Sequence, residues 1–448
     1  MSKSILTIFL VFSTFVLLNG QPAEHNNSYW NATLSDSTQL RLTYSQRGSH
    51  FKLYSRPGSS KAVLGNKYII ARLARKVASH TIEITGKVNY RNDTAFLQGN
   101  YRTLTAERDF SGFIHGKELN AKIGQNSLQG KLTQQYQPAR DYRAIARAAI
   151  DTSRCYLFDP AILKSEAWNS FEEKVLRLSS VVADDYEFEN MYNFNAQKLP
   201  FSHYGIRLNK PPRKIAGNKG EDQSKKFELK KLNATTVLFT VKTFSASAEE
   251  IQPYIDTLRN LQCGNLIIDL RGNTGGTIAS ALPLARFLVK DTLYGGVFIT
   301  QKYFKTHENL PSVGSYKAFT IFSEASFELI INGIHTTEGL CLVVYPEKNP
   351  FPGKIYILTN GSTGSTCEPL VYGLKHSKRA TIVGARTYGG MLNGEQFSIT
   401  KNFRLWVPTA DYYTSDGKKI DRVGVMPDVV CKQEGALEEA LELINKKL

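Results

Sequence analysis

Cysteine is scarce in this chain of 448 residues, and its placement excludes two kinds of site. The five cysteines are widely spaced, and no two of them form a Cys-x-x-Cys pair. A disulfide scaffold needs densely paired cysteines, and a thiolate zinc site needs cysteines close in sequence. The sequence also lacks the His-Glu-x-x-His motif of zinc peptidases and the Gly-Lys-Ser/Thr end of a phosphate loop. We therefore expect neither a disulfide framework nor a metal site.

Acidic residues are in the minority, which bears on the partners of the protein. Lys and Arg number 56 against 40 Asp and Glu, for a formal net charge of +16. A basic surface favours anionic partners. The positive charge is spread along the chain without a nucleic-acid-binding motif, so we expect no nucleic-acid partner.

The chain has no apolar run long enough to cross a membrane. The longest, residues 5–18, is shorter than the ~20 residues that span a bilayer. It follows Lys3 and precedes Asn19-Gly20, a pattern typical of a secretory signal with a small residue before the cut. The sequence predicts a signal peptide over 1–20, cleavage after Gly20, and export to a periplasm or to the outside of the cell, without a transmembrane segment in the mature chain.

The residue pattern changes three times along the chain. Residues 21–140 contain short alternating runs, such as 39–44, 81–85 and 94–99, which indicate an antiparallel β-rich module. Residues 141–208 have apolar residues at three- and four-residue spacing, which indicates helices. Residues 209–231 form a basic linker or loop. From 232 to 448 apolar strands alternate with helices, which predicts a largely parallel α/β core; the strands are 237–241, 266–270, 355–359 and 381–384, and the helices are 249–261, 278–288 and 368–375.

Two of the core strands are followed by segments with residues suited to catalysis. Arg271-Gly272-Asn273-Thr274-Gly275-Gly276 follows the strand at 266–270, and glycines there let backbone N–H groups approach a negative charge. Gly361-Ser362-Thr363-Gly364-Ser365-Thr366 follows the strand at 355–359, where a serine between a strand and a helix can be a nucleophile. Each has a structural alternative: the first segment as a tight turn, and Ser362, Thr363 or Ser365 as a helix cap.

Four segments together resemble one peptidase family. They are Asp-Leu-Arg-Gly-Asn-Thr-Gly-Gly at 269–276, Thr-Gly-Ser-Thr-Cys-Glu at 363–368, Ile-Val-Gly-Ala-Arg-Thr-Tyr-Gly-Gly at 382–390 and Asp-Gly-Lys-Lys-Ile-Asp-Arg-Val-Gly-Val-Met-Pro-Asp at 416–428. Their order resembles that of the C-terminal processing, or tail-specific, serine peptidases and their tricorn-type relatives, over 232–448. The resemblance implies a layered α/β core like those of Clp protease and crotonase. It also implies Ser365 as the nucleophile and oxyanion amides from Thr366 with Gly275 or Gly276.

The chain departs from the Ser/Lys branch of that family at two points. The catalytic Lys of that branch corresponds to Gly390 here, and residues 209–231 are too short to hold its PDZ domain. The resemblance is therefore to a PDZ-free branch with a Ser-His-acid arrangement. In it His203, directly before the core, matches the base, and Asp421 stands where those relatives carry a supporting Glu. Lys242, at the place of the tricorn-type histidine on the first core strand, is the alternative base.

These residues imply an exported serine endopeptidase that acts on polypeptides through an acyl-enzyme, without metal or organic cofactor. Cys367, two residues after the nucleophile, is expected to pack in the core. Eight basic residues against three acidic ones in 209–231 predict a preference for acidic or carboxylate-bearing segments. The alternative is a catalytically inactive binding protein on the same fold.

Overall fold

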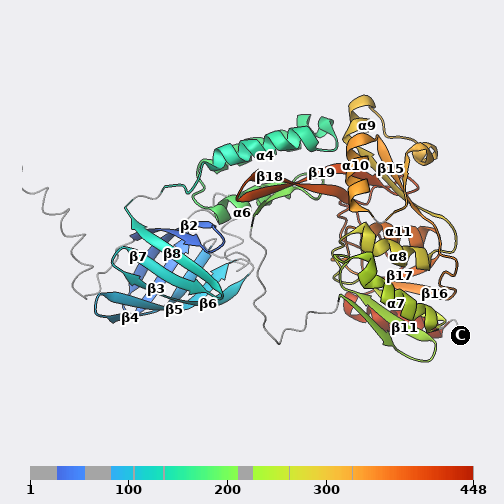
Figure 1. Cartoon of the computed structure of the whole chain (residues 1–448), viewed down its shortest axis with the longest axis horizontal. Helices are drawn as coiled ribbons and strands as arrows, with labels where there is room; N and C mark the ends of the chain where they lie inside the picture. Colours follow the sequence, from blue (N-terminus) through green and yellow to red (C-terminus); the bar gives the residue numbers. More distant parts are fainter. Residues whose placement is uncertain are drawn as a thin grey trace, which may run out of the picture.

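The computed structural model describes residues 28–55, 82–103, 106–134, 137–209, 226–261, 263–324 and 326–446. The predicted signal peptide lies outside the described residues, as does 210–225, which is most of the basic segment. The described chain forms a β-barrel, a layer of helices and a larger α/β part, in that order along the sequence (Figure 1).

The N-terminal β-rich segment closes into a barrel. Its eight antiparallel strands pair in sequence order, and β1 also pairs with β8. Side chains alternate across each strand: in β5, Ala95 and Leu97 are buried while Phe96 between them is 44% exposed. The strands are β1 (Ser28–Leu34), β2 (Gln39–Arg47), β3 (His50–Ser55), β4 (Ile82–Arg91), β5 (Thr94–Thr103), β6 (Glu107–His115), β7 (Glu118–Ile123) and β8 (Asn126–Thr133). Apolar side chains fill the interior, so the barrel is a packed module.

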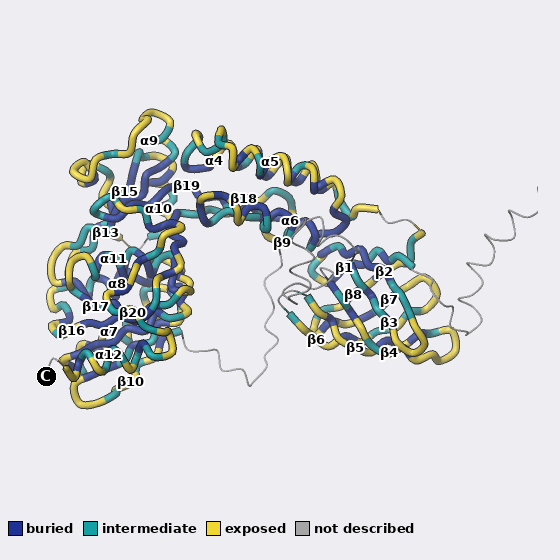
Figure 2. Tube along the Cα trace, turned by 180° about the vertical axis from the view of Figure 1, so that it is seen from behind, coloured by how far each residue is buried: buried dark blue, intermediate teal, exposed yellow. Residues whose placement is uncertain are grey.

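Three α-helices follow the barrel, and each starts at a capping side chain. Asp141, Ser165 and Asp184 accept the backbone N–H three residues ahead. The helices are α4 (Tyr142–Tyr156), α5 (Glu166–Ser179) and α6 (Asp185–Ala196), with the 3₁₀ turn η1 (Pro160–Lys164) between the first two. Their apolar faces share one core with Phe403 and Leu405 of a long strand, β19 (Phe403–Tyr413). The helices thus cover one face of that strand and its neighbour (Figures 1 and 2).

Two adjacent buried carboxylates join α6 to the barrel. Asp184 accepts the backbone N–H of Arg41, and Asp185 accepts that of Gln39, both on β2. Asp185 also forms an ion pair with Arg140 at 2.8 Å. Burial raises the pKa of Asp184 from 3.8 to about 6. Barrel and helices are therefore held by groups whose charge depends on pH.

The first sheet of the α/β part is mostly parallel. Its strand order is β10-β11-β12-β16-β17-β20, and only β10 is antiparallel to its neighbour. Side chains of β12 alternate between two faces: Leu266 and Ile268 face the layer of α7, α8 and α11, while Ile267 packs on α12 (Ala436–Asn445). The strands are β10 (Phe227–Lys231), β11 (Thr236–Val241), β12 (Asn265–Asp269), β16 (Lys354–Thr359), β17 (Ala380–Gly384) and β20 (Val429–Val430), and the helices are α7 (Ala248–Asn260), α8 (Ile278–Leu288) and α11 (Cys367–His376).

A second sheet lies on the other side of α8 and α11 (Figure 1). Its order is β14-β15-β13-β19-β18, with the short β9 also paired to β19. The strands are β9 (Gly205–Leu208), β13 (Leu293–Thr300), β14 (Thr320–Phe322), β15 (Gly339–Val344) and β18 (Leu392–Thr400). The remaining helical elements are α9 (Gln301–Thr306), η2 (Val313–Ala318), α10 (Phe327–Thr336) and η3 (Gln433–Gly435). Among the described residues, no helix has the length and apolarity to cross a membrane.

The predicted mixed α/β fold is confirmed. All four predicted core strands and all three predicted core helices are present, with ends shifted by no more than two residues. The second sheet, antiparallel except for the parallel pair β14 and β15, was not predicted. Its strands β18 and β19 carry polar residues between apolar ones and lie outside the regular strand-helix alternation, so the pattern did not group them.

Candidate active site

Ser365 lies in a strained turn between β16 and α11. Its φ of +54° is in the left-handed region, which costs an L-residue energy and is often found at functional sites. A Cβ on Gly275 would lie 2.6 Å from the Ser365 Cβ, so only glycine permits this approach. The predicted alternative of a helix cap is wrong: Thr366 occupies the N-cap position of α11 without a side-chain cap bond. Within the described residues the Ser365 hydroxyl has no hydrogen-bond partner.

Glu368, in the first turn of α11, holds this turn in place. Its buried carboxylate accepts the backbone N–H of Ser365 at 3.1 Å and those of Gly389 and Gly390 at 2.8 Å each. The Thr387 hydroxyl donates to it at 2.6 Å. Burial raises the pKa of Glu368, and these donors oppose the shift. Sequence reasoning missed the role of Glu368, although this residue belongs to the motif at 363–368. The available signal is an acidic residue in the first turn of a helix.

His203 and Ser365 line the same cavity. His203 immediately precedes β9 and has a φ of +57°. A Cβ on Gly390 would lie 3.7 Å from its Cε1 atom. The Tyr388 ring is nearer, with Cδ1 2.8 Å from that Cβ position, so this ring and the imidazole both border position 390, which corresponds to the family's Lys. Arg422 holds the preceding loop by donating to the carbonyl groups of Leu199 and Phe201.

Ser202 links His203 to Asp421. The Ser202 hydroxyl lies 2.6 Å from His203 Nδ1 and donates to Asp421 Oδ1 at 2.5 Å. Asp421 Oδ2 accepts the Ser202 backbone N–H at 3.0 Å, and Oδ1 also accepts that of Met391 at 3.1 Å. Asp421 thus supports the imidazole through Ser202. Sequence reasoning missed Ser202, whose only signal was its place beside His203.

The hydrogen bonds of Ser202 determine the tautomer of His203. A serine hydroxyl carries one hydrogen, and Ser202 donates it to Asp421. Toward His203 its oxygen must therefore accept, which places the proton of the neutral imidazole on Nδ1. Nε2 is then left with a free lone pair. Burial lowers the pKa of His203 below 6.5, Asp421 partly opposes this shift, and Arg422 adds to it. The ring is therefore neutral near pH 7.

The predicted oxyanion amides differ in availability. The Gly275 N–H donates to the Asn273 side chain at 2.9 Å, so it cannot also serve a ligand. The amides of Gly276 and Thr366 have no acceptor in the described part of the chain, and both residues line the cavity beside Ser365. The Thr366 hydroxyl donates to the Gly276 carbonyl oxygen at 2.8 Å, which ties the two segments together. The geometry favours Gly276 over Gly275.

Two other candidates lie apart from this arrangement. Lys242, the alternative base, is exposed at the end of β11 and does not line the cavity. Cys367 is fully buried, with its thiol 3.5 Å from the Asn273 carbonyl oxygen and its pKa raised by burial. Its expected role in packing agrees with this burial. Over the described ranges, no group of His, Cys, Asp and Glu side chains could hold a metal ion.

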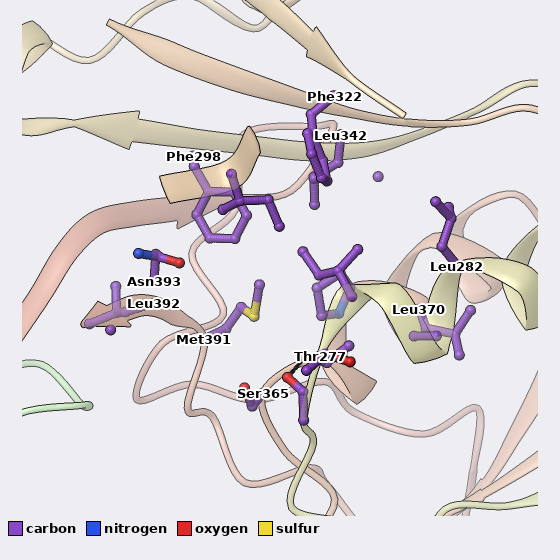
Figure 3. Close-up of a pocket in the computed structure, with 18 of the residues that line it drawn as sticks. Thr277, Leu282, Phe298, Phe322, Leu342, Ser365, Leu370, Met391, Leu392 and Asn393 are labelled. Carbon is purple, nitrogen blue, oxygen red and sulfur yellow. Dashed lines mark hydrogen bonds between the residues drawn. The ribbon is translucent and has the colours of Figure 1, made fainter. Parts of the chain in front are cut away.

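The cavity above Ser365 has a volume of about 660 Å³ and two different sides. On one side β18 and β19 contribute polar groups, among them Asn393 and Glu395. On the other side lies a region that we call the apolar chamber, formed by Ala281, Leu282, Ala285, Phe322 and Leu342. Figure 3 shows Ser365 and Thr277 at the base, Leu392 and Asn393 on one side, and Leu282 on the other.

Known proteins resemble the α/β part of this chain. Residues 236–431 match the model of peptidase family S41. A carboxyl-terminal-processing protease of Synechocystis is 26% identical over 191 residues, which are 42% of this chain and 36% of that protein. The chloroplastic carboxyl-terminal-processing peptidase 2 of Arabidopsis thaliana is 27% identical over 187 residues, which are 42% of this chain and 30% of that protein. The structure of a lipoprotein from Streptococcus agalactiae aligns with a TM-score of 0.47 at 19% identity, over 70% of this chain and 100% of that one.

The match thus spans only about a third of the length of these two curated relatives. It includes the predicted nucleophile and the predicted supporting acid, while His203 precedes it. The predicted resemblance to C-terminal processing peptidases is confirmed over this range. By this match, residues 236–431 are similar to peptidase family S41.

Proposed function

We propose that this chain is an exported serine endopeptidase that hydrolyses polypeptides through an acyl-enzyme on Ser365. One observation carries the proposal: Asp421, Ser202 and His203 form a hydrogen-bonded series that ends in the cavity where the Ser365 hydroxyl is free. A serine needs an adjacent base to act as a nucleophile near neutral pH, and a base needs a group that orients it. The series supplies both.

The first half of the reaction forms the acyl-enzyme. His203 Nε2 takes the proton of the Ser365 hydroxyl as Oγ attacks the carbonyl carbon of the peptide. The negative charge on the carbonyl oxygen is stabilised by the amides of Gly276 and Thr366. The charge that develops on the imidazole is stabilised by Asp421 through Ser202, because the Nδ1 proton donates to the Ser202 oxygen. The proton on Nε2 then passes to the leaving amine as the C–N bond breaks.

The second half repeats these steps with water. His203 Nε2 removes a proton from water, which attacks the ester carbon, and the same two amides stabilise the oxyanion. Collapse of the intermediate breaks the bond to Ser365 Oγ, which recovers its proton from His203. The peptide acid leaves, and no metal or organic group takes part.

Export and the preference for acidic segments complete the proposal. Export is supported by the signal-like pattern of residues 1–20. The acidic preference is supported by the charge of residues 209–231; its described end includes the exposed Lys230 and Lys231 on β10. Steering by such a segment acts over about 8 Å at physiological salt and weakens as salt increases.

A second candidate function is non-catalytic binding of an apolar small molecule. The observation that favours it is the cavity itself, whose volume and mainly apolar lining are typical of ligand pockets. Such a protein would not need an activated serine. The reactivity of Ser365 therefore separates the two functions.

Labelling with a fluorophosphonate probe tests the proposal. Wild type and the control Ser362→Ala, whose exposed serine lies three residues from the nucleophile, should be labelled at Ser365 and should degrade unfolded casein. Ser365→Ala should do neither, and His203→Ala should lose far more activity than Lys242→Ala. Wild-type protein that is neither labelled nor active would contradict the peptidase function. A larger loss in Lys242→Ala would move the base to Lys242.

A further inference from the structure

The apolar chamber begins beside Ser365 and leads away from it between the helices and the second sheet. Ala281, Leu282 and Ala285 come from α8, Phe322 from β14 and Leu342 from β15. Leu282 and Phe322 are each 6% exposed although they line a cavity, so the chamber is deep and mostly screened from solvent. Figure 3 shows Phe322, Leu342 and Leu282 around this space, with Phe298 on the side of Asn393.

The chamber is uncharged as well as apolar. The cavity as a whole has two ionisable lining groups in the described chain, His203 and Glu395, and both lie toward β9 and β18. Glu395 accepts a hydrogen bond from the Thr409 hydroxyl at 2.6 Å, and its Oε2 lies 3.0 Å from His335 Nε2. A charged side chain in the chamber would lose its hydration without gaining a partner, which is costly.

The position of His203 decides which part of a substrate enters the chamber. The imidazole returns its proton to the leaving amine, so the leaving half of the substrate lies on the His203 side of Ser365. His203 is next to Gly390, and Met391, Leu392 and Asn393 continue from there into the cavity wall. The chamber lies across Ser365 from this wall, as Leu282 opposite Leu392 in Figure 3 shows, and its α8 residues follow closely after Gly276 in the chain. The acyl half of the substrate, and its side chain next to the cut bond, lie on the chamber side.

We infer that the apolar chamber is the pocket for the residue that contributes the cleaved carbonyl, and that it selects a bulky uncharged side chain such as Phe or Leu. This inference rests on the proposed function. Ala281 and Ala285 determine how large that side chain can be, because they are one turn apart on α8 and present only methyl groups to the cavity. Full burial of a Phe or Leu side chain favours the larger substrate over Ala by roughly 10- to 150-fold in kcat/KM.

Peptides that differ only in the residue before the cut bond test the pocket. For wild type, kcat/KM should be highest for the Phe and Leu peptides, lower for the Ala peptide and lowest for the Asp and Lys peptides. Ala281→Leu fills the chamber and should lower kcat/KM at least about tenfold more for the Phe peptide than for the Ala peptide. The matched control is Ala279→Leu, the same substitution on the same helix at a residue that does not line the cavity. Leu342→Ala enlarges the chamber and should raise kcat/KM for the Trp peptide relative to that for the Phe peptide.

The outcomes separate this inference from the proposed function. A flat ranking, or a preference for Lys, Asp or Gly, in protein whose Ser365 is labelled by the fluorophosphonate would overturn the pocket and leave the peptidase function standing. The same holds if Ala279→Leu and Ala281→Leu change the ranking equally. Wild-type protein that shows neither labelling nor hydrolysis would overturn both. Melting temperatures identify a variant that has not folded. If one of Ala281→Leu and Leu342→Ala fails to fold, the other tests the pocket.

Discussion

Replacing Ser202 by alanine removes the one side-chain atom that joins His203 to Asp421. The variant deletes the 2.6 Å contact to His203 Nδ1 and the 2.5 Å bond to Asp421 Oδ1. Asp421 keeps two donors, the backbone N–H groups of residue 202 and Met391, so its buried carboxylate is still hydrogen-bonded. The effect on catalysis should therefore exceed the effect on folding.

The contacts set the size of each effect. A hydrogen bond that stabilises a charged group contributes about 1.5–3 kcal/mol, which here is lost from the imidazolium of the transition state. At 1.36 kcal/mol per factor of ten, kcat/KM should fall roughly 10- to 150-fold. The free energy of unfolding should fall by only about 1 kcal/mol, the value of an ordinary hydrogen bond.

The pH profile of kcat/KM is the decisive assay. The base must be neutral, so activity rises with pH through the pKa of His203, which burial holds below 6.5. In Ser202→Ala the imidazolium is less stabilised, so the rising limb should move to lower pH while the plateau falls. A merely structural role would lower the plateau without moving the limb. The reasoning is refuted if Ser202→Ala, measured beside the exposed control Ser362→Ala, keeps both the wild-type plateau and the wild-type limb.

Three further predictions concern stability. Ser365→Gly should abolish hydrolysis yet raise the free energy of unfolding by about 1 kcal/mol in chemical denaturation, because glycine adopts a φ of +54° without the strain of an L-residue. Ser365→Ala keeps that strain and should melt within a degree or two of wild type. Asp185→Ala should lower the free energy of unfolding by about 3–5 kcal/mol, because it removes one partner of a buried ion pair. Asp151→Ala, in an exposed ion pair, should lower it by under about 1 kcal/mol. Equal losses in denaturant titrations would contradict this. The raised pKa of Asp184 means that its folded form binds a proton more tightly than its unfolded form. The contribution of this group to the free energy of unfolding is therefore fully present below pH 3.8 and is lost as the pH rises through about 6. In Asp184→Asn the melting temperature should no longer fall over this pH range.

The sequence alone determined those features that depend on neighbouring residues. The period of the apolar residues predicted the parallel strands and their helices, because alternation and three- to four-residue spacing are local properties. The segment at 361–366 was placed correctly between β16 and α11 for the same reason. The glycine at 275 was expected to allow a close backbone approach, and the approach is to Ser365.

Only the tertiary structure decided the contacts between distant segments. Ser202 and Asp421 are 219 residues apart, and nothing near either residue indicates that the first lies between His203 and the second. The Asn273 side chain removes the Gly275 amide from the oxyanion site, which depends on how one loop folds back on itself. Closure of the barrel likewise depends on pairing of β1 with β8. In each case a donor or acceptor could pair with several groups, and the local sequence does not show which. The packing of the whole chain determines the partner, because a buried donor or acceptor must be satisfied where the fold places it.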